Sequence, residues 1–326
     1  MMATLRKSER KVTYRDYGCA RAHHTVGRTK RPHERFNDPV HLIRQVPEYS
    51  VIKLDPAAPL PAVPAHSDFW TIAQTMDELS LVCPTHQAPS VGILEREDHW
   101  IAFRVAGTME FSLTGIVARI SQVLADAGIG IFVVSTFDTD YILTAGQTVG
   151  QAIDSWQQSG INIIQPIAHT ARLDIVPLEY ELEDIANNNR DNKLWLDDFP
   201  SEGDLRISRL MQLTGPHAIG TTNLFQLRLR STGEACGGCG FKGEFHDGDF
   251  TAIEIGYGLT DSSQGKGLGT ELLRGLIAIA QNRGIAILVA EADNANAASH
   301  RILEKNGFEL FKSDDEVKWW KLSLRD

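Results

Sequence analysis

The chain has 326 residues, which is enough for two or three domains with hydrophobic cores of their own. Hydrophobic residues make up 42% and charged residues 23%, as in globular proteins, and no apolar run approaches the roughly 18 residues of a transmembrane helix. The formal net charge is −10, the N-terminus has no apolar signal segment, and the four cysteines are scattered. We therefore expect a cytoplasmic protein with no membrane partner.

Residues 1–45 differ from the rest in charge, with 11 Lys or Arg against 4 Asp or Glu. They show little helical or strand periodicity, so we predict a basic, disordered arm. A solvated tail is the favoured interpretation. An arm that attracts nucleic-acid phosphates would be expected to carry aromatic platforms, which are missing, so nucleic acid is not an expected partner. Glu9, Asp16 and Glu34 count against an organellar transit peptide.

The pattern changes at about Tyr49, and a first domain is expected over 46–166. Apolar residues at helical spacing predict helices over 111–127 and 149–158. Apolar runs bounded by turn residues predict strands over 100–105, 129–135, 141–144 and 161–164. In chain order these elements form a ferredoxin-like βαββαβ unit.

This region resembles the ACT domain, in the branch that occurs in tandem in amino-acid sensors. Five segments carry the resemblance in the family's order: Leu54–Pro56, Phe69–Thr71, Asp77–Ser80, Met109–Gly115 and Ser135–Leu143. Residues 49–99 would supply a second, shortened ACT-like half. The resemblance implies an amino-acid effector, and homo-oligomers formed through ACT sheets.

An amino-acid site is expected where the first helix of this domain begins. Free backbone donors there can bind a carboxylate, and a nearby aspartate can accept an ammonium group. The candidate effector residues are Thr108, Met109, Glu110, Phe111, Ser112, Asp138, Thr139 and Asp140. The alternative is structural: Ser112 as a helix N-cap, and the aspartates as turn formers.

A second domain is expected over 170–326. It begins with a strand over 172–178 and an acidic, Asn-rich helical segment over 181–195. Phe225, Leu227 and Leu229 alternate with polar residues, which predicts a half-buried strand. The domain closes with a hairpin over 308–324.

Cys236 and Cys239 lie in the next predicted strand, 235–241. A lone Cys-x-x-Cys without a second pair or nearby His ligands is weak evidence for zinc. We interpret the two cysteines as small, buried strand residues and expect no metal.

The most informative stretch runs from Gln264 to Thr270, between a predicted strand over 252–259 and a helix over 271–281. A glycine-rich loop before a helix can turn backbone N–H groups toward an anion. A P-loop is excluded because Lys266 is not followed by Ser or Thr. A dinucleotide-binding domain is disfavoured by the glycine spacing and because only 35 residues follow Glu291.

Gln264, Gly267 and Gly269 match a Gln-x-x-Gly-x-Gly loop that resembles the acyl-CoA loop of GNAT acyltransferases. The segment from Asn296 to Phe308 is similar to that family's Asn-x-x-Ser and Glu-Lys-x-Gly-Phe motif. The resemblance implies a GNAT fold, α/β with a mixed and splayed central sheet, and acetyl-CoA as co-substrate. The residues implied to bind it are Tyr257, Gly258, Leu259, Gln264, Gly265, Lys266, Gly267, Leu268, Gly269, Thr270, Asn296 and Ser299.

Each motif residue also has a structural explanation. The glycines can form a flexible turn, Asn296 can cap a helix, and Gly307 suits the left-handed end of the helix over 298–306. These explanations account for residues singly but not for their joint order. In the family, the strands 252–259 and 285–290 would splay apart around the pantetheine arm.

Acyl transfer to an amine needs a group that removes the amine proton. Glu254 on the strand before the loop is the candidate base, and a cross-strand surface charge is its alternative role. Backbone N–H groups near Tyr257–Leu259 would polarise the thioester carbonyl. Many family members carry a tyrosine as general acid where this chain has Leu303, so Ser299 or water is the candidate proton donor, and Tyr257 a second one.

The sequence therefore predicts an acetyl-CoA-dependent N-acetyltransferase that acts on an amine of a protein or a small molecule, by direct transfer in a ternary complex. Amino-acid binding to the ACT module would regulate it. Acceptor specificity would lie in the loops between Glu181 and His217. The alternative is a non-catalytic amino-acid sensor whose acyl-CoA domain binds without turnover, and Leu303 motivates it.

Overall fold

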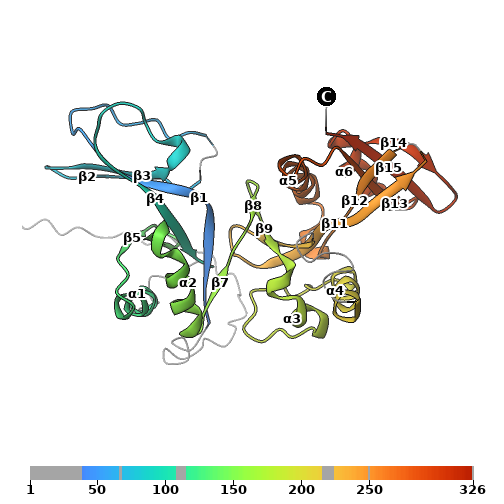
Figure 1. The fold of residues 1–326 in the computed structure, drawn as a ribbon, viewed down its shortest axis with the longest axis horizontal. Helices are drawn as coiled ribbons and strands as arrows, with labels where there is room; N and C mark the ends of the chain where they lie inside the picture. Colours follow the sequence, from blue (N-terminus) through green and yellow to red (C-terminus); the bar gives the residue numbers. More distant parts are fainter. Residues whose placement is uncertain (1–38, 66–67, 108–114, 215–223, 249, 325–326) are drawn as a thin grey trace, which may run out of the picture. The chain divides into compact units, whose positions relative to one another are not determined.

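Two β-sheets organise the chain in the computed structural model, which describes residues 39–65, 68–107, 115–214, 224–248 and 250–324 (Figure 1). The blue-to-green half of the ribbon contains a seven-stranded sheet, and the green-to-red half contains an eight-stranded sheet. The described residues belong to one compact unit, 38–326. Predictions that concern residues 1–38 alone lie outside the described residues.

The first sheet has the strand order β2-β3-β1-β4-β6-β5, with β7 paired to β1. Its strands are β1 (Val40–Leu54), β2 (Thr71–Gln74), β3 (Leu79–Pro84), β4 (Ile93–Val105), β5 (Ile131–Ser135), β6 (Asp140–Ala145) and β7 (Ile161–Ile164). The helices are α1 (Ile116–Asp126) and α2 (Val149–Gln158), with 3-10 turns η2 (Thr85–Gln87) and η3 (Gly146–Thr148). The predicted succession of strand, helix, strand, strand, helix and strand is confirmed from β4 to β7.

The strand β1 shows that the predicted C-terminal boundary of the basic arm lies too far along the chain. The arm was expected to reach residue 45, but β1 begins at Val40, and Leu42 and Ile43 are fully buried. Burying each of these side chains stabilises the fold by about 1.5–3 kcal/mol, which outweighs the local charge bias. The start of β1 also lies between β4 and β7. The first and last strands of the ferredoxin-like unit, β4 and β7, therefore do not pair with each other.

The two helices cover one face of this sheet. Ile120 and Leu124 of α1 and Trp156 of α2 are fully buried against Phe103 and other apolar side chains of the strands. The expected helix start at residue 111 lies outside the described residues, because 108–114 are not among them. Within the described part of 49–99, the shortened half consists of strands and one 3-10 turn, without an α-helix.

The second sheet has the order β14-β15-β13-β12-β11-β10-β9-β8. Its strands are β8 (Ala168–His169), β9 (Leu173–Pro177), β10 (Leu224–Leu229), β11 (Ala235–Asp247), β12 (Phe250–Leu259), β13 (Ile287–Asp293), β14 (Glu309–Ser313) and β15 (Val317–Ser323). Its helices are α3 (Leu182–Asn187), α4 (Glu202–Thr214), α5 (Leu268–Asn282) and α6 (Ala297–Lys305), with 3-10 turns η4 (Leu178–Tyr180) and η6 (Asp261–Ser263).

This sheet is mixed and splayed, as the sequence predicted. Its ladders are antiparallel except for β12 and β13, which run parallel and pair only from Ile253–Ile255 to Leu288–Ala290. The predicted final hairpin is confirmed by β14 and β15, and Gly307 ends α6 with a φ of 82°. The helix α4 was not predicted from the sequence.

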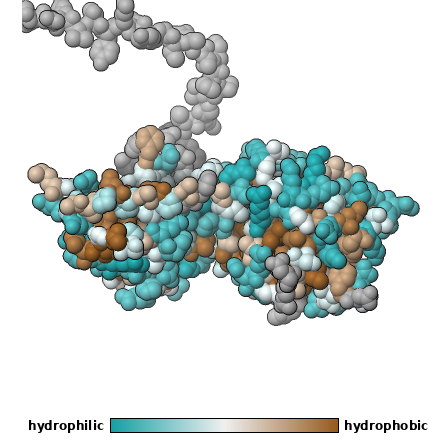
Figure 2. Space-filling model, turned by 90° about the horizontal axis from the view of Figure 1, so that it is seen from above, coloured by the Kyte–Doolittle hydropathy of each residue, from teal (hydrophilic) through white to brown (hydrophobic). Residues whose placement is uncertain are grey.

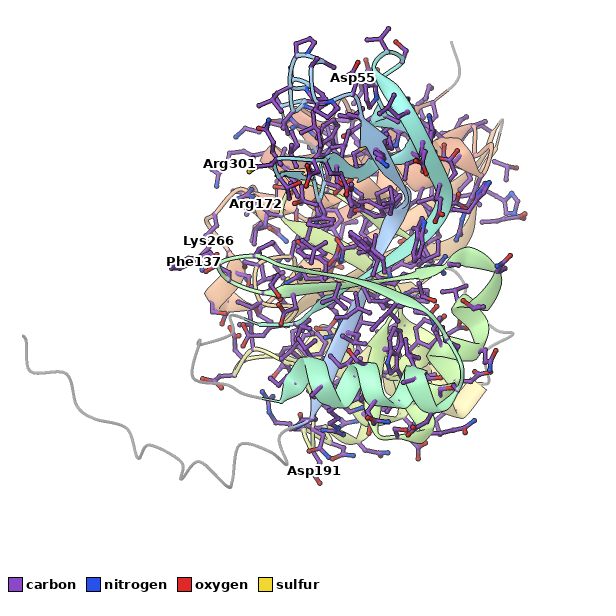
Figure 3. All side chains as sticks on the ribbon, turned by 90° about the vertical axis from the view of Figure 1, so that its left-hand side faces the viewer. Asp55, Phe137, Arg172, Asp191, Lys266 and Arg301 are labelled. Carbon is purple, nitrogen blue, oxygen red and sulfur yellow. The ribbon has the colours of Figure 1, made fainter. Side chains whose placement is uncertain are left out.

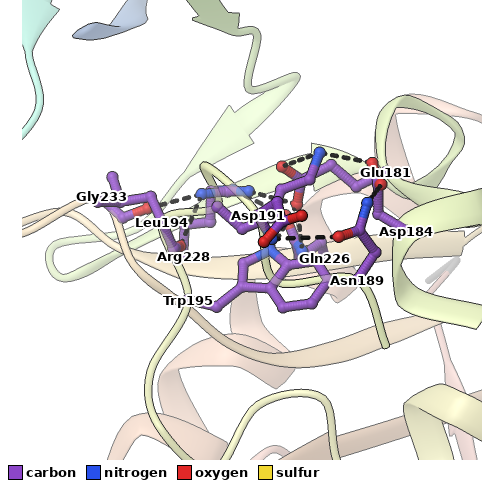
Figure 4. A network of polar contacts seen from close by, with 10 residues as sticks. Glu181, Asp184, Asn189, Asp191, Leu194, Trp195, Gln226, Arg228 and Gly233 are labelled. Atoms are coloured by element: carbon purple, nitrogen blue, oxygen red, sulfur yellow. Dashed lines mark hydrogen bonds and ion pairs between the residues drawn. The ribbon is translucent and has the colours of Figure 1, made fainter. Parts of the chain in front are cut away.

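The strand β10 differs from its prediction. It was expected to be half-buried, but its polar residues Gln226 and Arg228 are only 2% exposed. Glu181, directly before α3, and residues after α3 cover them: Glu181 accepts hydrogen bonds from Arg228 at 2.7 Å and from Trp195 at 2.8 Å (Figure 4). The predicted helical segment 181–195 is helical only to Asn187, because Asn188 takes the left-handed conformation that ends helices.

Apolar contacts join the two sheets within this unit. Ile43 of β1 and Ile164 of β7 pack in one buried cluster with Val176 of β9. Arg230 adds an ion pair of 2.8 Å to Asp68. The first residues of β1 are therefore held by both sheets.

The surface is mostly hydrophilic on the face that Figure 2 shows, with separate hydrophobic patches. The exposed apolar side chains of the first sheet's region include Leu60, Met76 and Val91. A homo-oligomer formed through this sheet stays a prediction. Among the described helices, none has the length and apolar character needed to cross a membrane.

Candidate functional site

The glycine loop lies at the head of α5, where the sequence placed it. Gly265 and Gly267 have φ angles of 72° and 76°, in the left-handed region that favours glycine, and α5 begins at Leu268. Residues 264–267 are exposed. The first N–H groups of a helix have no intrahelical acceptor, and the helix dipole favours an anion beside them. The loop thus presents free donors to solvent at the positive end of a 15-residue helix.

Leu268 and Gly269 have structural roles as well. Leu268 is buried in the core of the second sheet. A Cβ atom on Gly269 would lie 2.6 Å from Cδ1 of Ile302, so glycine lets α5 and α6 approach closely without a shift of the Ile302 side chain. Packing explains why these two positions hold leucine and glycine. Only their backbone N–H groups are then left to contact a ligand.

Arg172 holds the loop in place, and no local sequence pattern indicated this role. Its Nη1 donates to the carbonyl oxygen of Lys266 at 2.9 Å, and its Nε donates to Glu271 of α5 at 2.7 Å. Thr170 donates a further hydrogen bond to Glu271 at 2.6 Å. Burial would raise the pKa of Glu271, but these hydrogen bonds and the Arg172 charge lower it. The carboxylate is therefore kept ionised as an anchor for Arg172.

Asp198 fixes the other side of the loop. Its carboxylate accepts hydrogen bonds from the backbone N–H of Ser262 at 2.7 Å and from its hydroxyl at 2.8 Å. These bonds lower the pKa of Asp198. Arg172 and Asp198 lie 94 and 64 residues from their partners, so no local sequence pattern could have revealed them.

The loop follows the point where β12 and β13 separate. Beyond Ile255, the residues Tyr257–Leu259 pair with β11 on one side and do not pair with β13 on the other. Asn296 begins α6, and its Oδ1 accepts the N–H of Ser299 at 3.0 Å. The capping role of Asn296 is confirmed, and its contact with an acyl-CoA stays a prediction.

Tyr257 of β12 and Ser299 of α6 lie near each other. The Tyr257 hydroxyl is buried and has no hydrogen-bond partner of good geometry among the described residues. Burial raises the pKa of Tyr257, and the nearby Ser299 side chain opposes part of that rise. Leu303 is fully buried in the hydrophobic core, so it contributes no polar group here.

Glu254, the candidate base, forms an ion pair with Lys242 of β11 at 2.6 Å. Its side chain is 22% exposed. This contact is the cross-strand charge pair that the sequence left open as the alternative role. Its role as a base stays a prediction.

The two cysteines of β11 are buried, as interpreted from the sequence. Burial raises the pKa of Cys236 to about 12 and that of Cys239 further, so both thiols stay protonated at neutral pH. A Cβ atom on Gly237 would collide with the carbonyl oxygen of Gly258. The close approach of β11 and β12 thus explains why this segment holds small residues. No cluster of three metal-ligating side chains occurs among the residues that the structure describes.

The predicted effector residues are divided. Thr108, Met109, Glu110, Phe111 and Ser112 lie outside the described residues. Asp138 and Thr139 line a cleft of about 680 Å³. Asp140 is only 7% exposed on β6 and is not among the cleft's lining residues.

Comparison with known families agrees with both domains. Residues 172–309 match the model of the acetyltransferase (GNAT) domain, and residues 95–155 match that of the ACT domain. A third model, described as an N-terminal domain, matches residues 47–91. The chain thus carries an ACT domain followed by a GNAT acetyltransferase domain.

Curated relatives match only a short part of the chain. The L-methionine sulfoximine/L-methionine sulfone acetyltransferases of Pseudomonas aeruginosa and Pseudomonas paraeruginosa are each 38% identical over 58 residues. This match covers 18% of the chain and 34% of each relative. The chain therefore spans about a third of the length of these relatives.

Solved structures match the chain in parts. Protein Atu0741 from Agrobacterium tumefaciens is 31% identical and covers 40% of the chain and 96% of its own length, with a TM-score of 0.35. A GNAT-family acetyltransferase from Bacillus anthracis is 16% identical, covering 48% and 97%, with a TM-score of 0.36. The microcin C7 self-immunity acetyltransferase MccE, solved with acetyl-CoA and AMP, is 16% identical, covering 47% and 93%, with a TM-score of 0.34.

Proposed function

We propose that the chain is a cytoplasmic, acetyl-CoA-dependent N-acetyltransferase that acts on an amine and is regulated by an amino acid bound to its ACT domain. The observation that carries the proposal is the exposed glycine loop at the head of α5, beside the point where β12 and β13 separate. Free N–H groups at a helix N-terminus suit a pyrophosphate. The GNAT match over residues 172–309 supports acetyl-CoA as its source.

Direct transfer of the acyl group to the amine involves four chemical events. The acceptor nitrogen forms a bond to the acyl carbon while the carbon–sulfur bond breaks, one amine proton leaves, and the thiolate takes up a proton. Backbone N–H groups of Tyr257–Leu259, not paired to β13, would stabilise charge on the acyl oxygen. Ser299 lies beside the buried Tyr257 hydroxyl, and this pair would supply the proton to the thiolate in place of a tyrosine at Leu303.

Both classes of amine acceptor remain within the proposal. The two Pseudomonas relatives are named for amino-acid-like small molecules, which favours a small amine. A protein lysine or N-terminus is the other acceptor class. The segment 181–217 would select between them, and its described part contains α3 and α4.

Free-thiol release from acetyl-CoA tests the proposal. We expect turnover with at least one member of a panel of small amines, lysine peptides and peptide N-termini, at a rate far above the hydrolysis background. Calorimetric titration with acetyl-CoA serves as the matched binding measurement. Binding without thiol release for any acceptor would instead identify a sensor with a non-catalytic acyl-CoA domain.

Glu254→Gln tests the candidate base. If Glu254 removes the amine proton, kcat/KM should fall about 10²-fold or more, with acetyl-CoA affinity unchanged. Glu244→Gln is the matched control, because Glu244 lies on the neighbouring strand β11 and is exposed. A fully active Glu254→Gln enzyme would assign Glu254 to the Lys242 ion pair alone and leave the proton to water.

A further inference from the structure

A cleft beside the glycine loop is lined by residues of both the ACT domain and that loop. It has a volume of about 680 Å³ and is open to solvent. Arg104 of β4 and the turn residues Thr136, Asp138 and Thr139 line one part of it. Arg172 and Lys266 line another part, so residues 94 positions apart along the chain meet in one surface with the ACT turn. Figure 3 labels Arg172, Lys266 and Phe137, the residue directly before Asp138.

Most charges of the cleft are already balanced within the protein. Arg230 forms ion pairs with Asp68 at 2.8 Å and with Asp174 at 3.6 Å. Arg104 is buried and donates to the carbonyl oxygen of Arg230 at 2.6 Å. Burial lowers the pKa of Arg104, and the Asp174 charge opposes part of that fall. Two arginines thus face two aspartates.

The Asp68 carboxylate is a fixed part of this balanced set. Burial alone would raise its pKa, but hydrogen bonds and charges from His169 and Arg230 outweigh burial and lower it to about 2. Arg172 is balanced in the same way by Glu271 at 2.7 Å. These groups line or support the cleft without a charge left for a ligand.

Two lining charges are left over. Neither Lys266 nor Asp138 forms an ion pair with any residue that the structure describes. One is a cation on the glycine loop and the other an anion on the turn before β6. A ligand that matches this pair carries one anionic and one cationic group and no net charge. Thr136 and Thr139 add hydroxyl groups, and the stacked rings of Phe69 and Tyr141, 3.9 Å apart, add apolar surface.

Hydrogen bonds of Arg172 connect the cleft to the glycine loop. Arg172 lines the cleft and also donates to the carbonyl oxygen of Lys266 and to Glu271 in the first turn of α5. A carboxylate placed against Lys266 would neutralise a cation of the loop. Since the loop binds anions partly by charge, its affinity for a pyrophosphate would fall.

We propose that this cleft binds a free α-amino acid of no net charge, with its ammonium group at Asp138 and its carboxylate at Lys266, and that the bound amino acid weakens acyl-CoA binding. The proposal rests on the proposed function for the ligand of the glycine loop. It states where the effector binds, that the effector has no net charge, and that it lowers the affinity for acyl-CoA. By thermodynamic linkage, acetyl-CoA must weaken amino-acid binding by the same factor.

Calorimetric titration of the full chain with each of the twenty amino acids, with and without saturating acetyl-CoA, tests the proposal. We expect at least one neutral amino acid to bind, with a Kd that rises about fivefold when acetyl-CoA is present, at the low end of allosteric couplings. The Kd of acetyl-CoA should rise by the same factor when that amino acid is saturating. No binding by any amino acid, tighter binding of acidic or basic ones, or an unchanged Kd for acetyl-CoA would overturn it.

Asp138→Asn locates the site. It should weaken amino-acid binding at least tenfold and leave the Kd of acetyl-CoA, measured without amino acid, as in the wild type. Asp154→Asn on α2 is the matched control, because Asp154 is an exposed aspartate of the same domain outside the cleft. Wild-type amino-acid affinity in Asp138→Asn would overturn the assignment. Thiol release without amino acid reports on the proposed function alone, so the two proposals fail separately.

Discussion

Gly267→Ala is expected to weaken acetyl-CoA binding at least tenfold. Gly267 has a φ of 76°, which turns the loop's N–H groups outward ahead of α5. Alanine disfavours this conformation by about 1–2 kcal/mol, and a relaxed loop would lose one or two donors to the anion. A hydrogen bond to a charged group contributes about 1.5–3 kcal/mol, which is tenfold or more in Kd. Calorimetric titration with acetyl-CoA measures the effect.

Gly284→Ala is the matched control at the other end of α5. Gly284 has a φ of 71°, and a Cβ atom there would meet no atom within 4 Å. Both variants should lose a similar amount of stability in urea unfolding, since both strain the backbone in the same way. Only Gly267→Ala should lose acetyl-CoA affinity. Equal affinities in the two variants would place the pyrophosphate elsewhere.

Glu181→Gln is expected to lower the free energy of unfolding by about 3 kcal/mol. Arg228 is 2% exposed, and Glu181 is its charge partner at 2.7 Å (Figure 4). Removing one partner of a buried ion pair costs about 3–5 kcal/mol, because the other charge stays buried without compensation. Glutamine keeps an acceptor for Trp195 and Gln226, which places the effect at the low end.

Urea unfolding of Glu181→Gln and of Glu179→Gln measures this effect. Glu179 is exposed two residues earlier, so its variant should unfold like the wild type. The destabilisation should also depend on pH. Burial would raise the pKa of Glu181, but the Arg228 charge and its hydrogen bonds lower it below the ordinary value of 4.5.

The stabilisation by Glu181 is therefore present above about pH 4.5 and is lost as the pH falls through the lowered pKa. The difference between wild type and Glu181→Gln should be full at neutral pH and shrink under acidic conditions. A difference that is the same at pH 7 and at the lowest pH where the wild type folds would show that the charge of Glu181 has no part in it.

Local patterns in the sequence were sufficient for several elements. Apolar residues at helical spacing predicted α2 with its bounds, and glycines predicted helix ends such as Gly307. The glycine loop was recognisable because backbone conformation and residue type are tied together at Gly265 and Gly267. These features depend on residues that are close in the chain.

Other features could not be read from local patterns. Alternation of polar and apolar residues predicted an exposed face for β10, yet a segment starting 45 residues earlier covers Gln226 and supplies Glu181. The strand β1 begins within the basic segment because two domains bury Leu42 and Ile43. In both cases the decisive partner is distant in sequence.

The sequence alone determined the motifs of this protein: a glycine loop before a helix, an Asn-capped helix after the next strand, and an ACT-like domain ahead of both. Only the tertiary structure decided what holds and surrounds that loop. Arg172 and Asp198 hold the loop and the segment that leads into it, and Lys266 lines one cleft together with Asp138 of the ACT domain. Charge pairing and burial depend on distances in space, which residue type and spacing do not encode for partners so far apart in the chain.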